Sequence, residues 1–147
     1  EAGFDVAVHY HRGAEKAEAV RREVEALGRR AETIQADISD SAQCAALVER
    51  CAQKLGGIYA LVNNAGMTDD GLLMRMTDAQ FENVMRANMG GCFYCTRAAL
   101  PAMMKARQGR IVNITSVVGV TGNAGQANYA ASKAAVIGFT KASSRPR

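Results

Sequence analysis

Two side chains near the C-terminal end of the sequence have the types and spacing of an acid–base pair. Tyr129 and Lys133 stand four positions apart in an Ala-rich segment, so a helix places both on one face. A phenol has a reference pKa of about 10, which must fall by roughly 3 units, or ~4 kcal/mol, for proton transfer near pH 7. A cation one turn away supplies part of this change because it favours the phenolate.

A serine upstream of this pair adds a third group that could take part in a reaction. Ser116 follows a short β-branched run and precedes Tyr129 by thirteen residues. Its hydroxyl could polarise a carbonyl oxygen that Tyr129 protonates. A lone Tyr–Lys pair at this spacing is common on protein surfaces, so the catalytic interpretation depends on Ser116 and on a second motif upstream.

The second motif is the run Asn63, Asn64, Ala65 and Gly66, directly after a short apolar segment. Side-chain amides at such a place can tie neighbouring loops together. Gly66 allows a flat ligand to approach the backbone because it has no Cβ. The alternative is an ordinary Asn-rich turn.

The elements that position these residues follow from the hydrophobic pattern. Short β-branched runs alternate with amphipathic Ala-rich runs, which predicts βα units around a parallel sheet. We expect strands at residues 4–10, 31–36, 58–62 and 110–115, the last two buried as in a sheet covered on both faces. Helices are expected at 14–27, 41–55, 78–107 and 127–142, with a Gly-rich loop at 116–126. Asp78 is expected to cap the long helix, which Gly90, Gly91 or Pro101 can bend. Function is expected at the C-terminal ends of the strands.

Composition excludes several classes of protein. The 147 residues suit one domain, and the hydrophobic fraction of 48% with a charged fraction of 22% excludes disorder. The net charge is +4, but the cations are scattered among acids, which favours solvated helix faces over a nucleic-acid interface. A phosphate-bearing ligand remains compatible with this excess. No run reaches the ~18 apolar residues of a membrane span and no signal-peptide pattern occurs, so we expect a cytoplasmic protein.

The four cysteines have a structural and a chemical interpretation. Cys44 and Cys51 fall on one helix face two turns apart, too far to form a disulfide. Cys92 and Cys95 have the C-x-x-C spacing of redox or zinc sites, but no second Cys/His pair accompanies them. We therefore predict core thiols and no metal site.

In order and spacing, the Asn63–Gly66 motif with Asn88, Ser116, Tyr129 and Lys133 resembles the short-chain dehydrogenase/reductase family. The resemblance extends from about residue 4 to residue 141. It implies an α/β fold with a Rossmann-like doubly wound parallel sheet and nicotinamide-dependent chemistry. Residues 71–76 and 122–129 are similar to the branch that reduces 3-oxoacyl thioesters on acyl carrier protein in fatty-acid biosynthesis.

The resemblance implies a role for each of these side chains. Tyr129 donates a proton to the substrate carbonyl oxygen, and Ser116 orients that carbonyl. Lys133 lowers the pKa of the phenol and holds the nicotinamide ribose. Asn88 holds a water that relays protons to Lys133, although Asn88 is alternatively a residue of the helix kink. The adenosine side is expected to be lined by Asn64, Ala65 and Gly66, with Asp37 contacting adenine.

The end of the first strand indicates which coenzyme is used. An NAD enzyme places a carboxylate there for the ribose hydroxyls, whereas a 2′-phosphate requires a cation. This sequence has Arg12 and no acid before Glu15, which predicts NADPH. The alternative is that Arg12 is a solvated turn residue.

Two further features suggest partners. The branch resembled receives acidic acyl carrier protein on basic residues near the active-site mouth, and Lys105, Arg107 and Arg110 could serve. A helix C-terminus also favours cations for dipole reasons alone. The helices at residues 85–104 and 127–142 are apolar over more than one face, as in core packing or, as the family implies, in a dimer interface within a homotetramer.

Residues 1–147 also depart from the family pattern. The TGxxxGxG turn and the strand before it are absent, as are the strands beyond Lys141, and polar residues 143–147 stand where a helix should continue. We therefore expect one partial Rossmann-like domain, internal to a larger one. Its sheet should have a gap between the strands at 4–10 and 58–62, and this chain alone should bind NADPH weakly or not at all.

Two other functions stay open on the sequence alone. The protein could be a family member that acts on a different small carbonyl or alcohol. It could also be an inactive fragment that only dimerises through its long helices.

Overall fold

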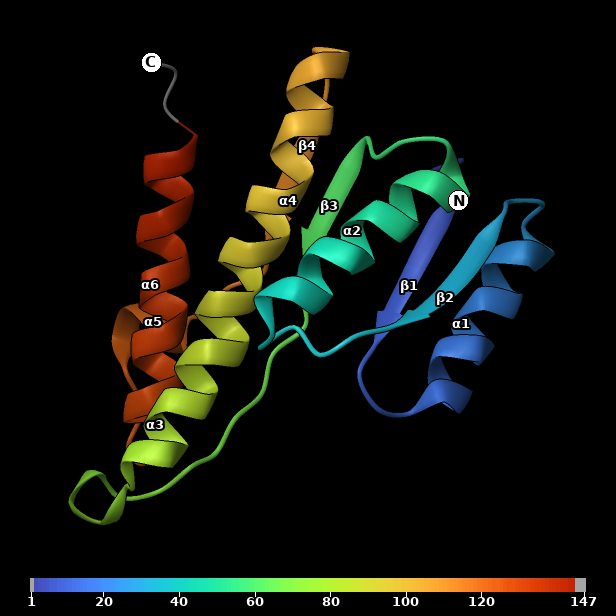
Figure 1. The fold of residues 1–147 in the computed structure, drawn as a ribbon. Coiled ribbons are helices and arrows are strands. Elements are labelled where there is room, and N and C mark those ends of the chain that lie inside the picture. Colours follow the sequence, from blue (N-terminus) through green and yellow to red (C-terminus); the bar gives the residue numbers. More distant parts are fainter. Residues whose placement is uncertain (1, 145–147) are drawn as a thin grey trace.

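The computed structural model describes residues 2–144, in which strands and helices alternate as expected (Figure 1). The strands are β1 (Val6–Tyr10), β2 (Ala31–Gln35), β3 (Ala60–Asn63) and β4 (Arg110–Asn113). The longer helices are α1 (Ala14–Ala26), α2 (Ser41–Leu55), α3 (Asp78–Met85), α4 (Gly91–Ala106) and α6 (Ala127–Ser143). Three short elements complete the chain: the 3-10 turn η1 (Leu73–Arg75), the π-helical turn η2 (Arg86–Gly90) and the helix α5 (Val118–Thr121).

The strands form two separate parallel pairs. β1 pairs with β2, where Val6 lies opposite Ala31, and β3 pairs with β4, where Ala60 lies opposite Arg110. Within residues 2–144 no hydrogen-bonded ladder joins the two pairs. The gap expected between the first and third strands is therefore confirmed.

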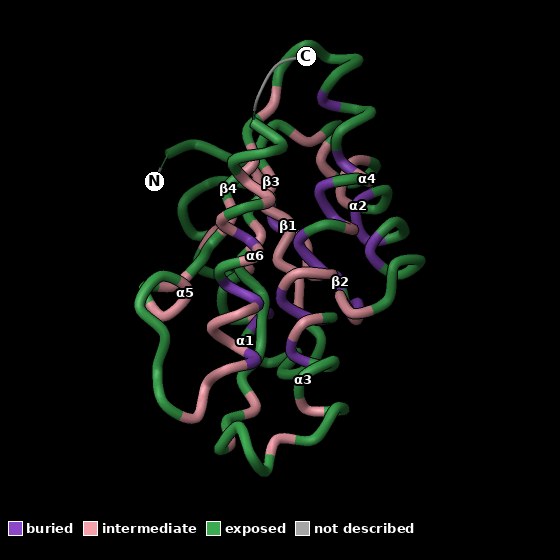
Figure 2. The backbone as a smooth tube through the Cα atoms, turned by 90° about the vertical axis from the view of Figure 1, so that its left-hand side faces the viewer, coloured by how far each residue is buried: buried purple, intermediate pink, exposed green. Residues whose placement is uncertain are grey.

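Helices α2 and α4 pack against each other in front of the two pairs (Figure 1). The core lies between these helices and the strands, and Figure 2 shows buried positions along both helices. Its buried members are Ile34, Ala36, Cys44, Leu47, Val48, Cys95, Ala99 and Met103. Of these, Cys44 on α2 and Cys95 and Ala99 on α4 have small side chains, which let the two helices approach closely. One core therefore connects strand pairs that share no hydrogen bonds.

The cysteines belong to this core rather than to a reactive site. All four are free thiols in the described chain, and Cys44, Cys92 and Cys95 are buried. Burial raises the pKa of the Cys92 thiol, which keeps it protonated. Within residues 2–144 no group of three metal-ligating side chains converges.

Helix α1 covers the opposite face of the first pair. Ala7 of β1 packs against the core, so Val8 points to the other face, because side chains alternate along a strand. There α1 contacts both β1 and β2 and buries Ala17. None of the helices between residues 2 and 144 is long and apolar enough to cross a membrane.

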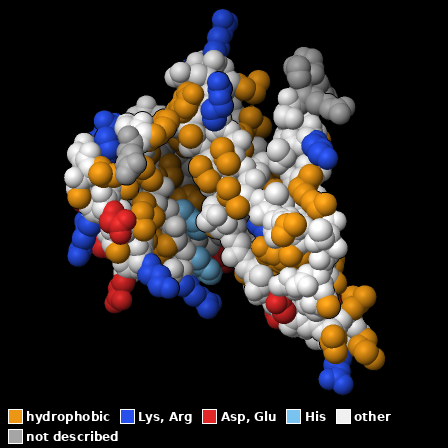
Figure 3. Space-filling view, turned by 180° about the vertical axis from the view of Figure 1, so that it is seen from behind, with side chains coloured by type: hydrophobic (Ala, Val, Ile, Leu, Met, Phe, Trp, Pro, Cys, Tyr) orange, Lys and Arg blue, Asp and Glu red, His pale blue; other side chains and the backbone are white. Residues whose placement is uncertain are grey.

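The expectation that the third and fourth strands are buried on both faces is wrong. Leu61 and Ile111 pack against the core, but Val62 is 57% and Val112 47% exposed. Within residues 2–144, helices pack on only one face of this pair, and apolar side chains show on the molecule when it is seen from behind (Figure 3). An apolar run predicts burial, but the number of covered faces depends on what packs there.

The long helical region is confirmed from Asp78 to Ala106, with the turn η2 inside it, directly before Gly91. A π-helical turn shifts the register of a helix, and this one includes Gly90 and adjoins Gly91, two of the positions at which a bend is expected. The expected cap is wrong by one residue. Thr77 is the N-cap and forms a reciprocal capping box with Gln80, whereas Asp78 is the first helical residue.

Other boundaries differ by a few residues. β1 begins at Val6, β3 at Ala60, and β4 ends at Asn113, while α5 forms in the segment expected to be a loop. The last helix continues to Ser143, beyond the expected end. Of the polar tail, residues 145–147 lie outside the described residues.

Candidate active site

A cleft of about 710 Å³ opens where β1 and β2 end. Its walls come from the end of β1, the start of α1, the loop after β2, and residues 65–67. This cleft contains four of the predicted coenzyme residues, namely Arg12, Asp37, Ala65 and Gly66. Parallel strands bring their carboxyl ends to one edge, which is why these distant residues meet.

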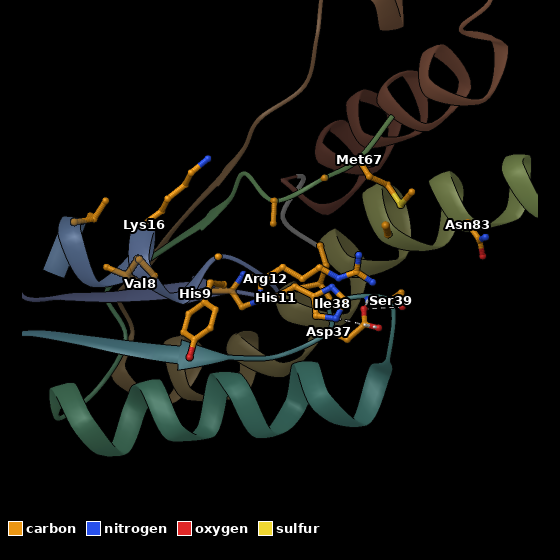
Figure 4. Close-up of a pocket in the computed structure, with 17 residues that line it drawn as sticks. Val8, His9, His11, Arg12, Lys16, Asp37, Ile38, Ser39, Met67 and Asn83 are labelled. Carbon is orange, nitrogen blue, oxygen red and sulfur yellow. Dashed lines mark hydrogen bonds and ion pairs between the residues drawn. The ribbon is translucent and has the colours of Figure 1, made fainter. Parts of the chain in front are cut away.

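The cleft contains one fixed carboxylate, Asp37, with His11 and Arg12 close to it (Figure 4). The backbone N–H and the hydroxyl of Ser39 donate to Asp37 Oδ1 at 2.9 and 2.7 Å. These hydrogen bonds lower the pKa of Asp37, and the nearby charges of His11 and Arg12 lower it further. Asp37 Oδ2 lies 3.9 Å from His11 Nε2. The loop after β2 thus presents an ionised, oriented carboxylate.

A second cation in the cleft was missed by the sequence interpretation. Lys16 lines the same cleft as Arg12, from the first turn of α1. Gly13, the N-cap of α1, has a φ of 80°, which lets the chain turn from β1 into the helix. Lys16 therefore lies close to the end of β1 in sequence and lines the cleft there, and its position three residues after Gly13 was the signal available. Figure 3 shows histidine side chains in this hollowed region.

The Tyr–Lys pair lines a second, adjoining hollow of about 360 Å³. The other lining residues are Asn64, Gly66, Met67 and Thr68. Because Gly66 and Met67 line both hollows, the segment after β3 separates the cleft at β1 from the Tyr–Lys pair.

Lys133 is held by the end of β4. Its Nζ donates to the carbonyl of Ile114 at 2.9 Å and lies 5.7 Å from the centroid of the Tyr129 ring. The Thr115 hydroxyl in turn donates to the Lys133 carbonyl at 2.9 Å. Only 6% of Lys133 is exposed, and burial lowers the pKa of its ammonium group. The structure thus places a buried amine one turn from the phenol.

Asn88 lies in the π-helical turn η2. Turns of this kind are frequent at functional sites. Its amide donates to the Met67 carbonyl at 3.0 Å and to the Ser132 hydroxyl at 2.9 Å, while its Oδ1 accepts from Met67 N–H at 2.8 Å. It is both a residue of this π-helical turn and a contact of the site, so the two interpretations are compatible.

Ser116 is placed differently from the other candidates. Its hydroxyl oxygen accepts a hydrogen bond from Val118 N–H at 3.2 Å, at the start of α5. Among the described residues it lines neither hollow and has no hydrogen bond to Tyr129. A catalytic role for Ser116 stays a prediction.

Asparagine side chains also join the elements beneath the site. Asn63 donates to Asn113 Oδ1 at 2.8 Å and to Thr96 Oγ1 at 3.1 Å. Asn113 donates to Thr140 Oγ1 at 2.9 Å. The amide expected to tie neighbouring loops thus connects β3 and β4 with α4 and α6.

Gly66 can be tested because it is confined on the side of Asn88. A Cβ built at Gly66 would lie 2.8 Å from Asn88 Oδ1. We expect Gly66→Ala to displace Asn88, to cost about 1–3 kcal/mol in the free energy of unfolding and to lower kcat at least tenfold. Gly71→Ala is the control, since its Cβ would meet only Gln80 Nε2, at 3.8 Å. Equal effects of the two substitutions in melting and activity measurements would contradict the steric argument.

Comparison with known proteins shows what this arrangement belongs to. Residues 1–146 match the family model described as short chain dehydrogenase.

The chain belongs to the short-chain dehydrogenase family.

Membership of this family of oxidoreductases confirms the resemblance found in the sequence motifs. The 3-oxoacyl-[acyl-carrier-protein] reductase FabG of Staphylococcus aureus (strain Mu50) is 46% identical over 145 residues, which is 99% of this chain and 59% of that protein. The 3-oxoacyl-[acyl-carrier-protein] reductase of Synechocystis sp. is 45% identical over 139 residues, which is 95% of this chain and 56% of that protein.

A solved structure confirms the fold class. The putative short-chain alcohol dehydrogenase of Sinorhizobium meliloti 1021 superimposes with a TM-score of 0.90 at 33% identity, over 94% of this chain and 54% of that one. The α/β Rossmann-like fold with a partial parallel sheet is therefore established. This chain spans less than two thirds of each relative's length.

Proposed function

We propose that the natural full-length protein reduces 3-oxoacyl thioesters carried on acyl carrier protein to 3-hydroxyacyl thioesters with NADPH. The observation that carries this proposal is the shared hollow of Tyr129, Lys133, Asn64 and Gly66, directly beside a cleft with cations. The names of the relatives at 45–46% identity support the thioester as substrate. The Tyr–Lys pair supports carbonyl reduction.

The cleft residues fit a nicotinamide coenzyme with a 2′-phosphate. Arg12 and Lys16 would hold the phosphate, because both line the cleft at the end of β1. Asp37 would accept from adenine, since Ser39 fixes its orientation. The tight approach of Gly66 to Asn88 leaves backbone rather than a side chain facing the ligand. When bound, the coenzyme supplies the hydride for carbonyl reduction.

The chain's own residues would manage the proton. We assign Tyr129 as the acid that protonates the carbonyl oxygen, with Lys133 as the neighbouring cation that favours the phenolate afterwards. Lys133 would also hold the nicotinamide ribose. Asn88 would position a water in the relay to Lys133, and Ser116 would orient the carbonyl.

Basic residues at the end of α4 support an acidic protein partner. Arg107 is the C-cap of α4 and, among the described residues, the single non-glycine with a positive φ, at 52°. That backbone conformation is unfavourable for a residue with a Cβ, and residues held in such conformations often have a functional role. We propose Arg107, with Lys105 and Arg110, as the surface that receives acyl carrier protein.

The outer faces of the long helices support an oligomer. Phe93 is 37%, Leu100 39% and Met104 74% exposed on α4, an apolar face beside α6. We propose a cytoplasmic homo-oligomer, a tetramer in the branch resembled, assembled through these helices.

The proposal is tested by assaying the natural full-length protein with an acetoacetyl thioester and either NADPH or NADH. We expect reduction with a clear preference for NADPH. A preference for NADH would contradict the coenzyme assignment. Reduction of simple ketones without reduction of the thioester would contradict the substrate and favour another member of the family.

Arg12 should carry the coenzyme preference. We expect Arg12→Ser to raise the KM for NADPH about ten- to hundredfold and to leave the KM for NADH unchanged, because only NADPH has the phosphate that Arg12 binds. Arg22→Ser is the matched control, since Arg22 lies in α1, is not among the residues that line the cleft, and has 75% of its side chain exposed. If both coenzymes were affected equally, Arg12 would be a turn residue without a role in selectivity.

A further inference from the structure

Asn128, next to Tyr129 in the first turn of α6, is a fully buried polar side chain with hydrogen bonds to three segments. Its exposed fraction is 0%. Its amide nitrogen donates to the carbonyl of Asp69 at 2.8 Å and to the carbonyl of Gln80 at 3.3 Å. Its Oδ1 accepts from Tyr129 N–H at 2.8 Å. Replacing a buried amide with this set of partners lowers the free energy of unfolding, because each partner would be left without its hydrogen bond.

The bond to Tyr129 provides a cap for α6. The first four N–H groups of a helix have no partner within it. Within the described chain, the N-cap residue Gln126 offers α6 no side-chain hydrogen bond, and Asn128 Oδ1 satisfies the N–H of Tyr129 instead. The backbone of Tyr129 is therefore oriented by the same side chain that binds the loop after β3.

That loop is also fixed to α3. The Asp69 carboxylate accepts from Gln80 Nε2 at 2.9 Å, and Gln80 Oε1 accepts from Thr77 N–H at 3.0 Å in the capping box of α3. Asn128 thus binds the backbone of Asp69, whose side chain is already bound to α3 through Gln80. A shift of Asp69 would break hydrogen bonds to both α3 and α6.

Two asparagines hold one short segment from opposite ends. Asn88 binds both backbone groups of Met67, and Asn128 binds the carbonyl of Asp69, two residues further on. Met67 lines both hollows, and Thr68 lines the hollow that contains Tyr129. This segment therefore lies between the cleft at β1 and the hollow that contains the phenol.

We propose that Asn128 is a positioning residue that holds Tyr129 in register with residues 67–69, and so with the ligand in the adjoining cleft. The proposal rests on the proposed reductase function for its kinetic consequence. The side chain does not line either hollow, so it acts through Tyr129 and the loop rather than on the substrate.

The test compares Asn128→Asp and Asn128→Ala with Asn123→Asp in the natural full-length protein. Asn128→Asp preserves size but turns two donated hydrogen bonds into repulsion between oxygens, and Asn128→Ala removes the amide without adding a charge. Asn123 is exposed, and among the residues that the structure describes its side chain bonds only to nearby Gln126, which makes it a matched control. Active sites are counted by titration of NADPH fluorescence, so that misfolded protein does not enter kcat.

We expect kcat per active site to fall about ten- to hundredfold in both Asn128 variants, with little change in the KM for the thioester. The solvent deuterium isotope effect on kcat should rise, because proton transfer from a displaced phenol becomes the slow step. Amide hydrogen exchange should quicken at residues 66–71 and 127–131. Asn123→Asp should match the wild type in all three measurements.

A wild-type kcat per active site in Asn128→Ala overturns the proposal, even if the variant melts earlier. If the wild-type protein does not reduce the thioester, the proposed function is wrong, and exchange then decides the role of Asn128. Faster exchange at both segments in Asn128→Ala but not in Asn123→Asp supports it, and unchanged exchange overturns it.

Discussion

Replacing Tyr129 with phenylalanine should lower kcat for thioester reduction about 10²- to 10⁴-fold, the range typical of a lost general acid. The substitution keeps the ring beside the ammonium group of Lys133, 5.7 Å from its centroid, and removes only the hydroxyl. Binding of NADPH, followed by fluorescence, should therefore stay close to that of the wild type. Steady-state kinetics of the natural full-length protein would measure the loss.

The control for this substitution is Tyr59→Phe. Tyr59 stacks on Phe4 with ring centroids 5.9 Å apart and lines neither hollow, so its hydroxyl should not affect kcat. A Tyr129→Phe protein with wild-type kcat would remove the proton donor from the proposed mechanism. A loss of NADPH binding in the same variant would mean that the ring has moved.

Replacing Lys133 with methionine should lower kcat/KM at least about a hundredfold, because the cation that favours the phenolate is lost. The same substitution should not lower the free energy of unfolding. Burial lowers the pKa of Lys133, so the folded protein binds this proton less tightly than the unfolded chain. Below the folded-state pKa the charged ammonium therefore opposes folding, and this opposition disappears as pH rises through the ordinary pKa.

At pH 7 the melting temperature of Lys133→Met should therefore not fall below that of the wild type. The Ile114 carbonyl loses its donor, which offsets part of the gain. Lys141→Met, an exposed position on the same helix, is the control and should change neither activity nor melting. A marked drop in the melting temperature of Lys133→Met would contradict the balance in which the desolvation of the charge dominates.

Much of the site could be predicted because it depends on local periodicity and strand ends. The side chains at positions 129 and 133 share a helix face whatever the helix packs on, since 3.6 residues make one turn. Likewise, the Asn63–Gly66 motif follows an apolar run, which places it at the carboxyl edge of any parallel sheet. The family motif adds the order of the elements, and the structure confirms that order.

Other features depended on contacts between residues far apart in the chain. Asn128 and Asp69 are separated by 59 positions, so no local pattern indicates their hydrogen bond. The place of Ser116 was likewise open, because its hydroxyl is used by the turn into α5. Lys16 was visible as a first-turn cation, but only the fold shows that it faces the same cleft as Arg12.

The sequence by itself determined the α/β class, the order of the elements, the Tyr–Lys pair and the gap in the sheet, since each follows from short-range periodicity or from a family motif and its absence. Only the tertiary structure decided which strand faces are covered and how the segment after β3 is held between Asn88 and Asn128. The burial of a strand face and the hydrogen bonds of Asn88 and Asn128 both depend on side chains from distant parts of the chain. Whether such contacts form, and how much they stabilise the fold, depends on tertiary packing and not on the residues adjacent in sequence.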